Sequence, residues 1–379
     1  MPDNKKIKSD STPSVVDLFS GTGGLSWGLS KHGFEVLAGI DHWTAALKTF
    51  KHNHKNALVF DTDIEDLPPE TLLNKLGLMP GELDVLVGGP PCQGFSKNTP
   101  ASARFFDDPR NLLFRYFMEH VRVIQPKVVV MENVAEIFNA YDGSVRNEIV
   151  TKFKDYGYSV DVKVLNAADF GVPQKRRRCF FFAVRGSEVP EFPKPTHGIT
   201  KSEALFSDTL PYVTAWEAIQ DLPKPTDSDS PVSYQQEPKT EFQNWIRGNV
   251  KRVANHKLKV LSPIQQERYD SLKPGQGIKD LPDAIRPKGG YSGAYGRLDQ
   301  SCLAPTITRW VFHPGSGRYG HPIQKRIITM REAARLQSFS DDFEFIGSIN
   351  GIAGQIGNAV PPRFMAAFAP IIKQVLKSF

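Results

Sequence analysis

Cysteine is scarce in this sequence. The chain has three cysteines among its 379 residues, Cys92, Cys179 and Cys302, and they lie far apart. Their number and spacing exclude a disulfide framework and a Cys-x-x-Cys zinc site. We therefore predict a reducing, intracellular environment and no bound metal.

Long apolar runs are also missing. No stretch approaches the roughly 20 apolar residues of a membrane-spanning helix, and the first residues, MPDNKKIKSDSTPS, lack the apolar centre of a signal peptide. These absences predict a soluble, cytoplasmic protein that does not contact a membrane. With 40% hydrophobic and 23% charged residues, the chain can bury a real core. Its length predicts two domains, or one large domain with an appendage.

The charge of the chain is unevenly distributed. The net charge is only +6, but residues 186–246 hold 4 Lys and Arg against 10 Asp and Glu, whereas residues 247–290 hold 10 against 4. A run of like charges is often no more than a solvated face, and it is also typical of a surface that binds nucleic acid. Composition alone leaves both interpretations open.

Short apolar runs alternate with amphipathic stretches between residues 14 and 184. This alternation predicts an α/β fold with a doubly wound, mostly parallel sheet. One helix is expected over Leu112–Ile124, with Leu113, Tyr116, Phe117, His120 and Ile124 on its apolar stripe. The expected strands are Val15–Phe19, Glu35–Ile40, Leu58–Phe60, Asp84–Val87, Val128–Met131, Tyr158–Leu165 and Cys179–Val184.

The character of the sequence changes after Arg185. Residues 186–246 contain eight prolines and little periodicity, which is typical of functional surfaces or linkers. Regular structure is expected again near the end, where Thr329 and Glu332 form a capping box before a helix that runs to about Gln337. A last amphipathic helix is expected over Phe364–Leu376, with a kink at Pro370.

The first expected strand ends in a glycine-rich turn, DLFSGTGG, over residues 17–24. Such a turn lets a nucleoside cofactor approach the backbone, and Asp41, at the end of the second strand, is placed to bind ribose hydroxyls. The turn lacks the full Gly-x-Gly-x-x-Gly spacing, so a purely structural turn is also open. Asp63, after the third strand, suits an adenine amino group and could equally be an ordinary loop carboxylate.

Two further motifs follow strands at the same edge of the expected sheet. The fourth strand runs into GGPPCQGFS, residues 88–96, where glycines and prolines hold Cys92 on a sharply bent, stiff loop. A lone cysteine is often a small buried hydrophobe, but this loop favours a reactive thiol. Glu132 directly follows the apolar run of the fifth strand. It could form a salt bridge, or, in a pocket that raises its pKa, present a proton at neutral pH.

The segment QKRRR, residues 174–178, enters the last strand of the sheet. In an extended segment Arg176 and Arg178 share one face while Arg177 lies on the other. Two guanidinium groups near Cys92 would favour its thiolate and could bind phosphate.

Together these motifs resemble the DNA (cytosine-5)-methyltransferase family of the bacterial restriction-modification type. The resemblance rests on DLFSGTGG, GPPCQGFS, Glu132-Asn133-Val134, QKRRR and the later GNAVPP, residues 357–362, which occur in the family's order and cover about two thirds of the chain. It implies an S-adenosylmethionine-dependent fold with Rossmann-like topology and a smaller target-recognition domain. It also implies that the final helix packs back beside the first strand.

The resemblance implies a covalent route for methylation of a flipped cytosine in duplex DNA. The Cys92 thiolate attacks C6, Glu132 protonates or hydrogen-bonds N3, and C5 then takes the methyl group from S-adenosylmethionine. Arg178 is expected to bind the cytosine O2, and Arg176 to support Cys92 or a nearby phosphate. A loop of about residues 94–110 is expected to close over the base.

The family also implies the residues around the cofactor and the DNA. Many relatives have Glu at the position of Asp41, and the shorter acid is still expected to reach ribose. The expected cofactor-binding residues are Phe19, Gly21, Gly23, Gly24, Asp41, Asp63, Ile64, Pro90, Leu113 and Asn358. The expected DNA-binding residues are Gln93, Ser96, Lys257, Lys259, Arg297 and Thr308, and Tyr291 and Tyr295 lie in a loop that could approach base edges.

The expected domain division follows from the same resemblance. Residues 1–13 form a flexible tail, residues 14–190 and 320–379 form the catalytic domain, and residues 191–319 form the small domain, with sequence readers within 225–300. The expected protein is a monomer that acts on double-stranded DNA, bacterial or phage-encoded, with a separate cognate restriction endonuclease as a possible partner.

Three alternative functions fit the sequence less well. A tRNA cytosine-5 methyltransferase of the same fold would carry a Cys-Phe-Thr signature, which is absent. A catalytically silent DNA-binding regulator would not need every catalytic position to be intact. A nicotinamide-dependent oxidoreductase, suggested by the glycine turn alone, has no use for Pro-Pro-Cys-Gln or Glu-Asn-Val.

Overall fold

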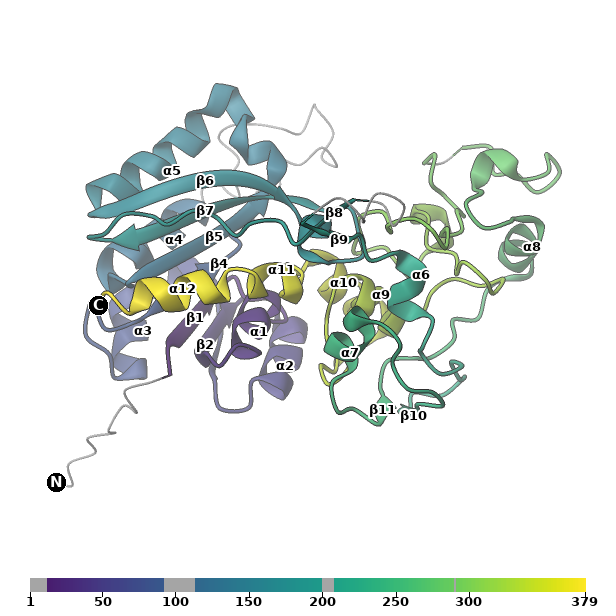
Figure 1. Cartoon of the computed structure of the whole chain (residues 1–379), viewed down its shortest axis with the longest axis horizontal. Helices are drawn as coiled ribbons and strands as arrows, with labels where there is room; N and C mark the ends of the chain where they lie inside the picture. The colour runs from purple at the N-terminus through teal and green to yellow at the C-terminus, as the bar shows by residue number, and fades with distance from the viewer. Residues whose placement is uncertain (1–11, 92–112, 200–207, 290) are drawn as a thin grey trace.

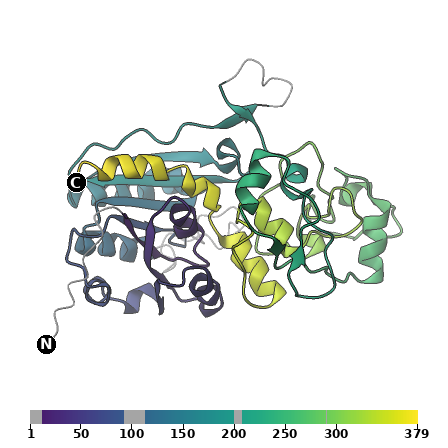
Figure 2. The ribbon, with the colours of Figure 1, turned by 60° about the horizontal axis from the view of Figure 1, so that its bottom comes forward.

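The computed structural model describes residues 12–91, 113–199, 208–289 and 291–379. Figures 1 and 2 show two lobes side by side. The first lobe is built around a β-sheet, and both the beginning and the end of the chain belong to it. The second lobe contains the helices α6 to α10 and long irregular connections.

Within the described residues, seven strands form the large sheet, in the order β3-β2-β1-β4-β5-β7-β6. Strands β1 to β5 pair in parallel, and β7 runs antiparallel between β5 and β6. This confirms the expected doubly wound, mostly parallel sheet. The strands are β1 (Ser14–Leu18), β2 (Glu35–Asp41), β3 (Leu58–Asp61), β4 (Val85–Gly88), β5 (Val128–Val134), β6 (Tyr158–Asn166) and β7 (Arg177–Arg185).

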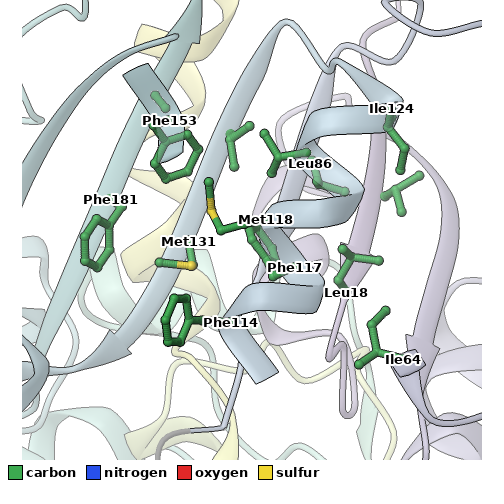
Figure 3. Close-up of a cluster of buried hydrophobic side chains, with 14 of the residues drawn as sticks. Leu18, Ile64, Leu86, Phe114, Phe117, Met118, Ile124, Met131, Phe153 and Phe181 are labelled. Carbon is green, nitrogen blue, oxygen red and sulfur yellow. The ribbon is translucent and has the colours of Figure 1, made fainter. Parts of the chain in front are cut away.

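Alternate side chains of the central strands enter two separate cores, one on each face of the sheet. In β5, Val129 and Met131 join the first core, while Val128 and Val130 join the second. Figure 3 shows the first core, where Phe117 and Met118 pack close to Met131. Because both faces are buried, the central strands are apolar throughout, which is why their positions can be read from the sequence.

Helix α4 (Leu113–Ile124) confirms the expected helix but not its whole apolar stripe. Tyr116 is exposed, and the buried side includes Phe114, Met118 and Val121 as well as Phe117. The stripe is therefore wider than expected, because the helix lies between the sheet and its neighbours. The other helices of this lobe are α1 (Gly24–Ser30), α2 (Thr44–Asn53), α3 (Pro69–Leu76) and α5 (Ser144–Asp155).

The end of the chain returns to the first lobe, as expected. Phe364, Phe368 and Ile372 pack in the second core together with Val15 of β1. The expected single helix is wrong in detail: it is divided into α11 (Pro362–Ala366) and α12 (Ala369–Leu376). Pro370 lies in the first turn of α12, where a proline has no hydrogen bond to lose, so it begins a new helix and does not kink one.

The second lobe has its own hydrophobic core. Side chains from residues 213–246, Tyr269, residues 298–312 and residues 327–356 share it. Residues on both sides of the expected boundary at 319/320 thus pack together, and the domain division itself stays a prediction. The short strands β8 (His197–Ile199) and β9 (Leu210–Pro211) lead into this lobe. They are followed by α6 (Ala215–Ile219), β10 (Val232–Ser233), α7 (Glu241–Arg247), β11 (Arg252–Val253), α8 (Pro263–Ser271), α9 (Met330–Leu336) and α10 (Ile349–Asn358).

Buried charged groups hold this irregular lobe together. The expected capping box is confirmed: the backbone N–H of Thr329 donates to Glu332 at 2.7 Å at the start of α9. At the other end of α9, Arg335 is fully buried and ion-paired with Asp221 and Asp341. These contacts join α9 to the start of the lobe, because Asp221 follows α6 directly.

Candidate active site

The predicted site motifs meet at one edge of the sheet. Strands β1, β2, β4 and β5 are parallel neighbours, so their carboxyl ends lie together. In open α/β sheets this edge is where ligands bind. The glycine turn follows β1, Asp41 ends β2, the loop with Pro90 follows β4 and Glu132 lies in β5.

The glycine turn needs its unusual backbone. Phe19, Gly21 and Gly23 all have positive φ, at 57°, 52° and 90°. A Cβ added to Gly21 would meet no atom of the described residues within 4 Å, so the backbone there is open on their side. Gly24 serves packing instead, because a Cβ there would lie 2.3 Å from the carbonyl oxygen of Val360. The turn therefore leaves its backbone accessible at Gly21 and packs closely at Gly24 against Val360, near the C-terminal helices.

Asp41 shapes this turn. Its Oδ2 accepts a hydrogen bond from the backbone N–H of Gly21 at 2.8 Å, and its Oδ1 accepts one from Trp43 N at 2.8 Å. Asp63 is exposed, with its Oδ1 3.6 Å from Nδ1 of His42, and Ile64 beside it is buried. The acid that was expected to bind ribose thus also fixes the glycine turn.

Several buried polar atoms under the turn have no hydrogen-bond partner among the described residues: Asp17 Oδ1, Ser20 Oγ and Thr22 Oγ1. The other oxygen of Asp17 accepts from the backbone N–H of Ser26 in α1, at 3.2 Å. Burial raises the pKa of Asp17 to about 7, although hydrogen bonding with Ser26 opposes the shift. Sequence reasoning gave Asp17 no role, because its position at the end of an apolar strand does not reveal how deeply it is buried.

Asp17→Asn is expected to alter the pH dependence of stability. An acid whose pKa is raised from 3.8 to about 7 stabilises the fold at low pH, and that contribution is lost as the pH rises. The free energy of unfolding of the wild type should fall relative to that of the variant by about 2 kcal/mol between about pH 5 and about pH 8. Urea unfolding at both pH values measures the difference. Parallel pH profiles of the two proteins would contradict the shifted pKa.

The loop after β4 begins against β5. The carbonyl oxygen of Pro90 accepts a hydrogen bond from Nδ2 of Asn133 at 3.0 Å, which fixes the start of the loop. A Cβ on Gly89 would lie 3.1 Å from Oε2 of Glu132, so this glycine leaves space beside the carboxylate. Cys92, Gln93 and Ser96, with the expected closing loop, lie outside the described residues.

Glu132 is buried and paired with Arg178. The Oε1 of Glu132 lies 2.8 Å from Nε of Arg178, which stands opposite Val134 where β7 pairs with β5. Burial raises the pKa of Glu132, and the positive charges of Arg178 and Arg176 act against that rise. The salt bridge and the raised pKa, which the sequence left as alternatives, occur together.

Arg176 is also buried, but its partners are carbonyl groups. Its guanidinium donates to Ile307 O at 3.2 Å, Gly357 O at 3.2 Å and Ala359 O at 2.8 Å. It therefore joins β7 to the segment around residue 307 and to the end of α10. Asn358 lies exposed between two of these acceptors, and Leu113 at the start of α4 is half-buried.

The predicted DNA-binding residues differ in accessibility. Arg297 is buried, which does not match its expected role as a DNA contact. Its guanidinium donates to the carbonyl groups of Leu272, His321, Pro322, Ile323 and Gln324. Lys259 donates to Phe312 O at 2.5 Å, and burial lowers its pKa. Lys257 is exposed and ion-paired with Asp229 at 2.8 Å. Thr308 is half-buried, with its hydroxyl 3.1 Å from that of Tyr319.

Among the described residues, no group of three or more His, Cys, Asp or Glu side chains could hold a metal ion. No described helix is both long enough and apolar enough to cross a membrane.

Comparison with known proteins gives consistent matches. A model of the family described as C-5 cytosine-specific DNA methylase matches residues 14–374. The chain is 33% identical to the Type II methyltransferase M.AgeI of Thalassovita gelatinovora, with 95% of this chain and 99% of that protein covered. It is 35% identical to the Type II methyltransferase M1.HphI of Haemophilus parahaemolyticus, with 95% of this chain and 86% of that protein covered.

Solved structures of other proteins have the same fold as this chain. A protein of E. coli, assigned as a DNA modification methyltransferase encoded within a prophage, superposes with a TM-score of 0.75 at 29% identity and covers 97% of this chain and 100% of its own. DNMT2 of Spodoptera frugiperda superposes with a TM-score of 0.60 at 17% identity, covering 96% of this chain and 100% of its own, which supports the fold alone.

Proposed function

The chain belongs to the C-5 cytosine-specific DNA methylase family. We propose that the residues described above transfer a methyl group to C5 of cytosine in double-stranded DNA. The chain is a DNA (cytosine-5)-methyltransferase. The observation that carries the proposed mechanism is the buried pair of Glu132 and Arg178, at the sheet edge where the loop bearing Cys92 begins.

S-adenosylmethionine is the proposed methyl donor, and the glycine turn fits it. Among the described residues, nothing fills the space in front of the Gly21 backbone, and buried oxygen atoms of Asp17, Ser20 and Thr22 have no hydrogen-bond partner, so a polar ligand or water could bind them. When bound, S-adenosylmethionine supplies an electrophilic methyl group on a sulfonium. The residues proposed to hold it are Phe19, Gly21, Gly23, Gly24, Asp41, Asp63, Ile64, Pro90, Leu113 and Asn358, and no metal is proposed.

The proposed chemistry makes C5 of cytosine nucleophilic. The Cys92 thiolate forms a bond to C6, and Glu132 donates a proton or hydrogen bond to N3, so that electron density moves to C5. After C5 has taken the methyl group, loss of its proton and elimination of the thiolate give 5-methylcytosine. The raised pKa of Glu132 favours the protonated form that N3 requires.

The two arginines have different proposed roles. Arg178 is within 2.8 Å of Glu132 and is the proposed partner of the cytosine O2. Within the described residues, the guanidinium of Arg176 donates its hydrogen bonds to backbone carbonyl groups, so we assign it a positioning role, through the placement of β7 and of the segment around residue 307. Its burial favours this role over a contact with phosphate.

DNA contacts are proposed on both lobes. Gln93 and Ser96 are proposed DNA contacts in the closing loop, and Lys257 and Thr308 in the second lobe, while Arg297 is left out because of its burial. The Type II methyltransferases among the relatives support a restriction-modification role, with a separate cognate endonuclease as partner. We propose a monomer that acts in the cytoplasm, where its DNA would be.

Methyl transfer to nucleic acid tests this function directly. The protein is incubated with tritiated S-adenosylmethionine and either mixed-sequence duplex DNA or bulk tRNA, and the labelled base is identified. We expect label in 5-methylcytosine of DNA, and bisulfite mapping of a plasmid from expressing cells then gives the recognised site. Label in tRNA alone would favour the tRNA enzyme, which the family match does not favour, and no label would favour a silent regulator.

A further inference from the structure

An exposed tryptophan stands next to an exposed arginine in the second lobe. The side chain of Trp310 is 52% exposed, an unusual state for so large an aromatic group. Cζ of Arg309 lies 5.1 Å from the centroid of its ring, within the range of a cation–π contact. Neither residue belongs to the motifs that predicted the active site.

The turn that carries Trp310 is tightly held. The carbonyl oxygen of Trp310 accepts hydrogen bonds from His313 N at 2.8 Å and from Ser316 Oγ at 2.6 Å. Val311 N donates to Thr308 O at 3.0 Å, and Phe312, two residues after the tryptophan, is buried. Because the backbone is already ordered, binding through Trp310 would cost little conformational entropy.

The same turn lies against the active site. A Cβ on Gly357 would lie 2.2 Å from Arg309 N, so the two backbones are in direct contact. Arg176 donates to Ile307 O, and Arg178, two residues further along β7, pairs with Glu132. A continuous set of contacts therefore joins Glu132, the proposed partner of N3, to the turn of Trp310.

Exposed cations lie on and beside the segment that carries this turn. Lys175 is exposed, and its backbone is joined to the segment through bonds with Ala304 O and Thr306 Oγ1. Among the described residues, no ion pair neutralises Lys175 or Arg309. An exposed aromatic ring next to an unpaired cation is the combination with which proteins bind unstacked bases and their phosphates.

We propose that Trp310 stacks on a base next to the target cytosine and that Arg309 contacts the adjacent phosphate. Flipping the target unstacks its neighbours, and an aromatic ring at that position replaces the lost stacking. Stacking on a base face is tolerant of sequence, so the pair stabilises the flipped state and does not select the site. This inference rests on the proposed function and adds two residues to it.

The test uses duplexes that contain the mapped site, with 2-aminopurine at the target position, whose fluorescence rises when it is flipped. Trp310→Ala should weaken binding about 10-fold and lower the fluorescence at saturating protein, whereas Trp310→Phe should retain most of both. Arg309→Gln should instead reduce the slope of log Kd against log salt by about one. Thermal midpoints establish that each variant is folded.

Phe379→Ala is the matched control. Phe379 is 48% exposed and has Lys127 and Arg185 near its ring, at the opposite edge of the sheet. This variant should bind and flip DNA like the wild type. If Trp310→Ala behaves the same way, or if Trp310→Phe is as impaired as Trp310→Ala, the proposed stacking is overturned. A wild type that transfers no methyl group to DNA would instead overturn the proposed function.

Discussion

The Cys92→Ser variant is expected to transfer methyl groups to DNA at least about 10³-fold more slowly than the wild type. A serine hydroxyl is not ionised near neutral pH and is a far weaker nucleophile than a thiolate, so attack on C6 would fail. Incorporation of tritium from labelled S-adenosylmethionine into duplex DNA measures the loss. DNA binding should persist, because the substitution changes a single atom.

A covalent trap distinguishes loss of the nucleophile from general damage. With DNA that contains 5-fluorocytosine, the wild type should form an adduct that survives denaturation, because fluorine at C5 cannot leave as the proton does. Cys92→Ser should form none. Cys302→Ser is the control, since Cys302 is an exposed cysteine and should leave adduct formation unchanged. An adduct formed by Cys92→Ser would place the nucleophile elsewhere in the chain.

Glu132→Gln is expected to lower kcat about 10³-fold while changing the affinity for DNA much less. Glutamine has nearly the same shape and can still contact Arg178, but it cannot give a proton to N3. It also leaves the positive charges of Arg178 and Arg176 without their buried counter-charge. Single-turnover rates at saturating DNA measure the effect on the chemical step.

The pH profile adds a second measurement for Glu132. Burial raises its pKa, so the proton is retained to higher pH than in an ordinary glutamate and is lost as the pH rises through the shifted value. The wild-type rate should therefore have a falling limb at higher pH that Glu132→Gln lacks. Glu148→Gln, which breaks a surface pair with Arg115, should leave both rate and profile unchanged. A variant that keeps the falling limb would assign that limb to another group.

The sheet and its acidic edge could be predicted because their causes are local. Buried parallel strands are apolar throughout, and a carboxylate such as Glu132 that ends such an apolar run lies toward the carboxyl edge of the sheet. The glycine turn could be placed for the same reason. The strand of Glu132 itself runs further than expected, because β5 continues past Glu132 to Val134 through its pairing with β7. Asp17 was missed because its position in the strand looks ordinary, and only the fold shows that one of its oxygens is buried with no hydrogen-bond partner in the part of the chain that the structure describes.

The arginines and lysines could not be assigned from the sequence because their partners come from distant segments. Arg297 is surrounded by carbonyl groups of residues 272 and 321–324, and no local pattern announces this. Lys257 of the basic segment, residues 247–290, pairs with Asp229 of the acidic segment, residues 186–246, so the two segments contact each other. An excess of Lys and Arg in a segment therefore does not predict which of these side chains are unpaired and able to bind DNA.

The return of the chain to the first lobe also constrains how the protein folds during synthesis. Val15, Val85 and Val128 are made early, but Phe364, Phe368 and Ile372, which cover the same face of the sheet, are made only after the second lobe. Until then the nascent sheet exposes an apolar surface of the kind that aggregates or binds chaperones. The helices α11 and α12 thus complete the first lobe, and they can do so only after the whole second lobe has left the ribosome.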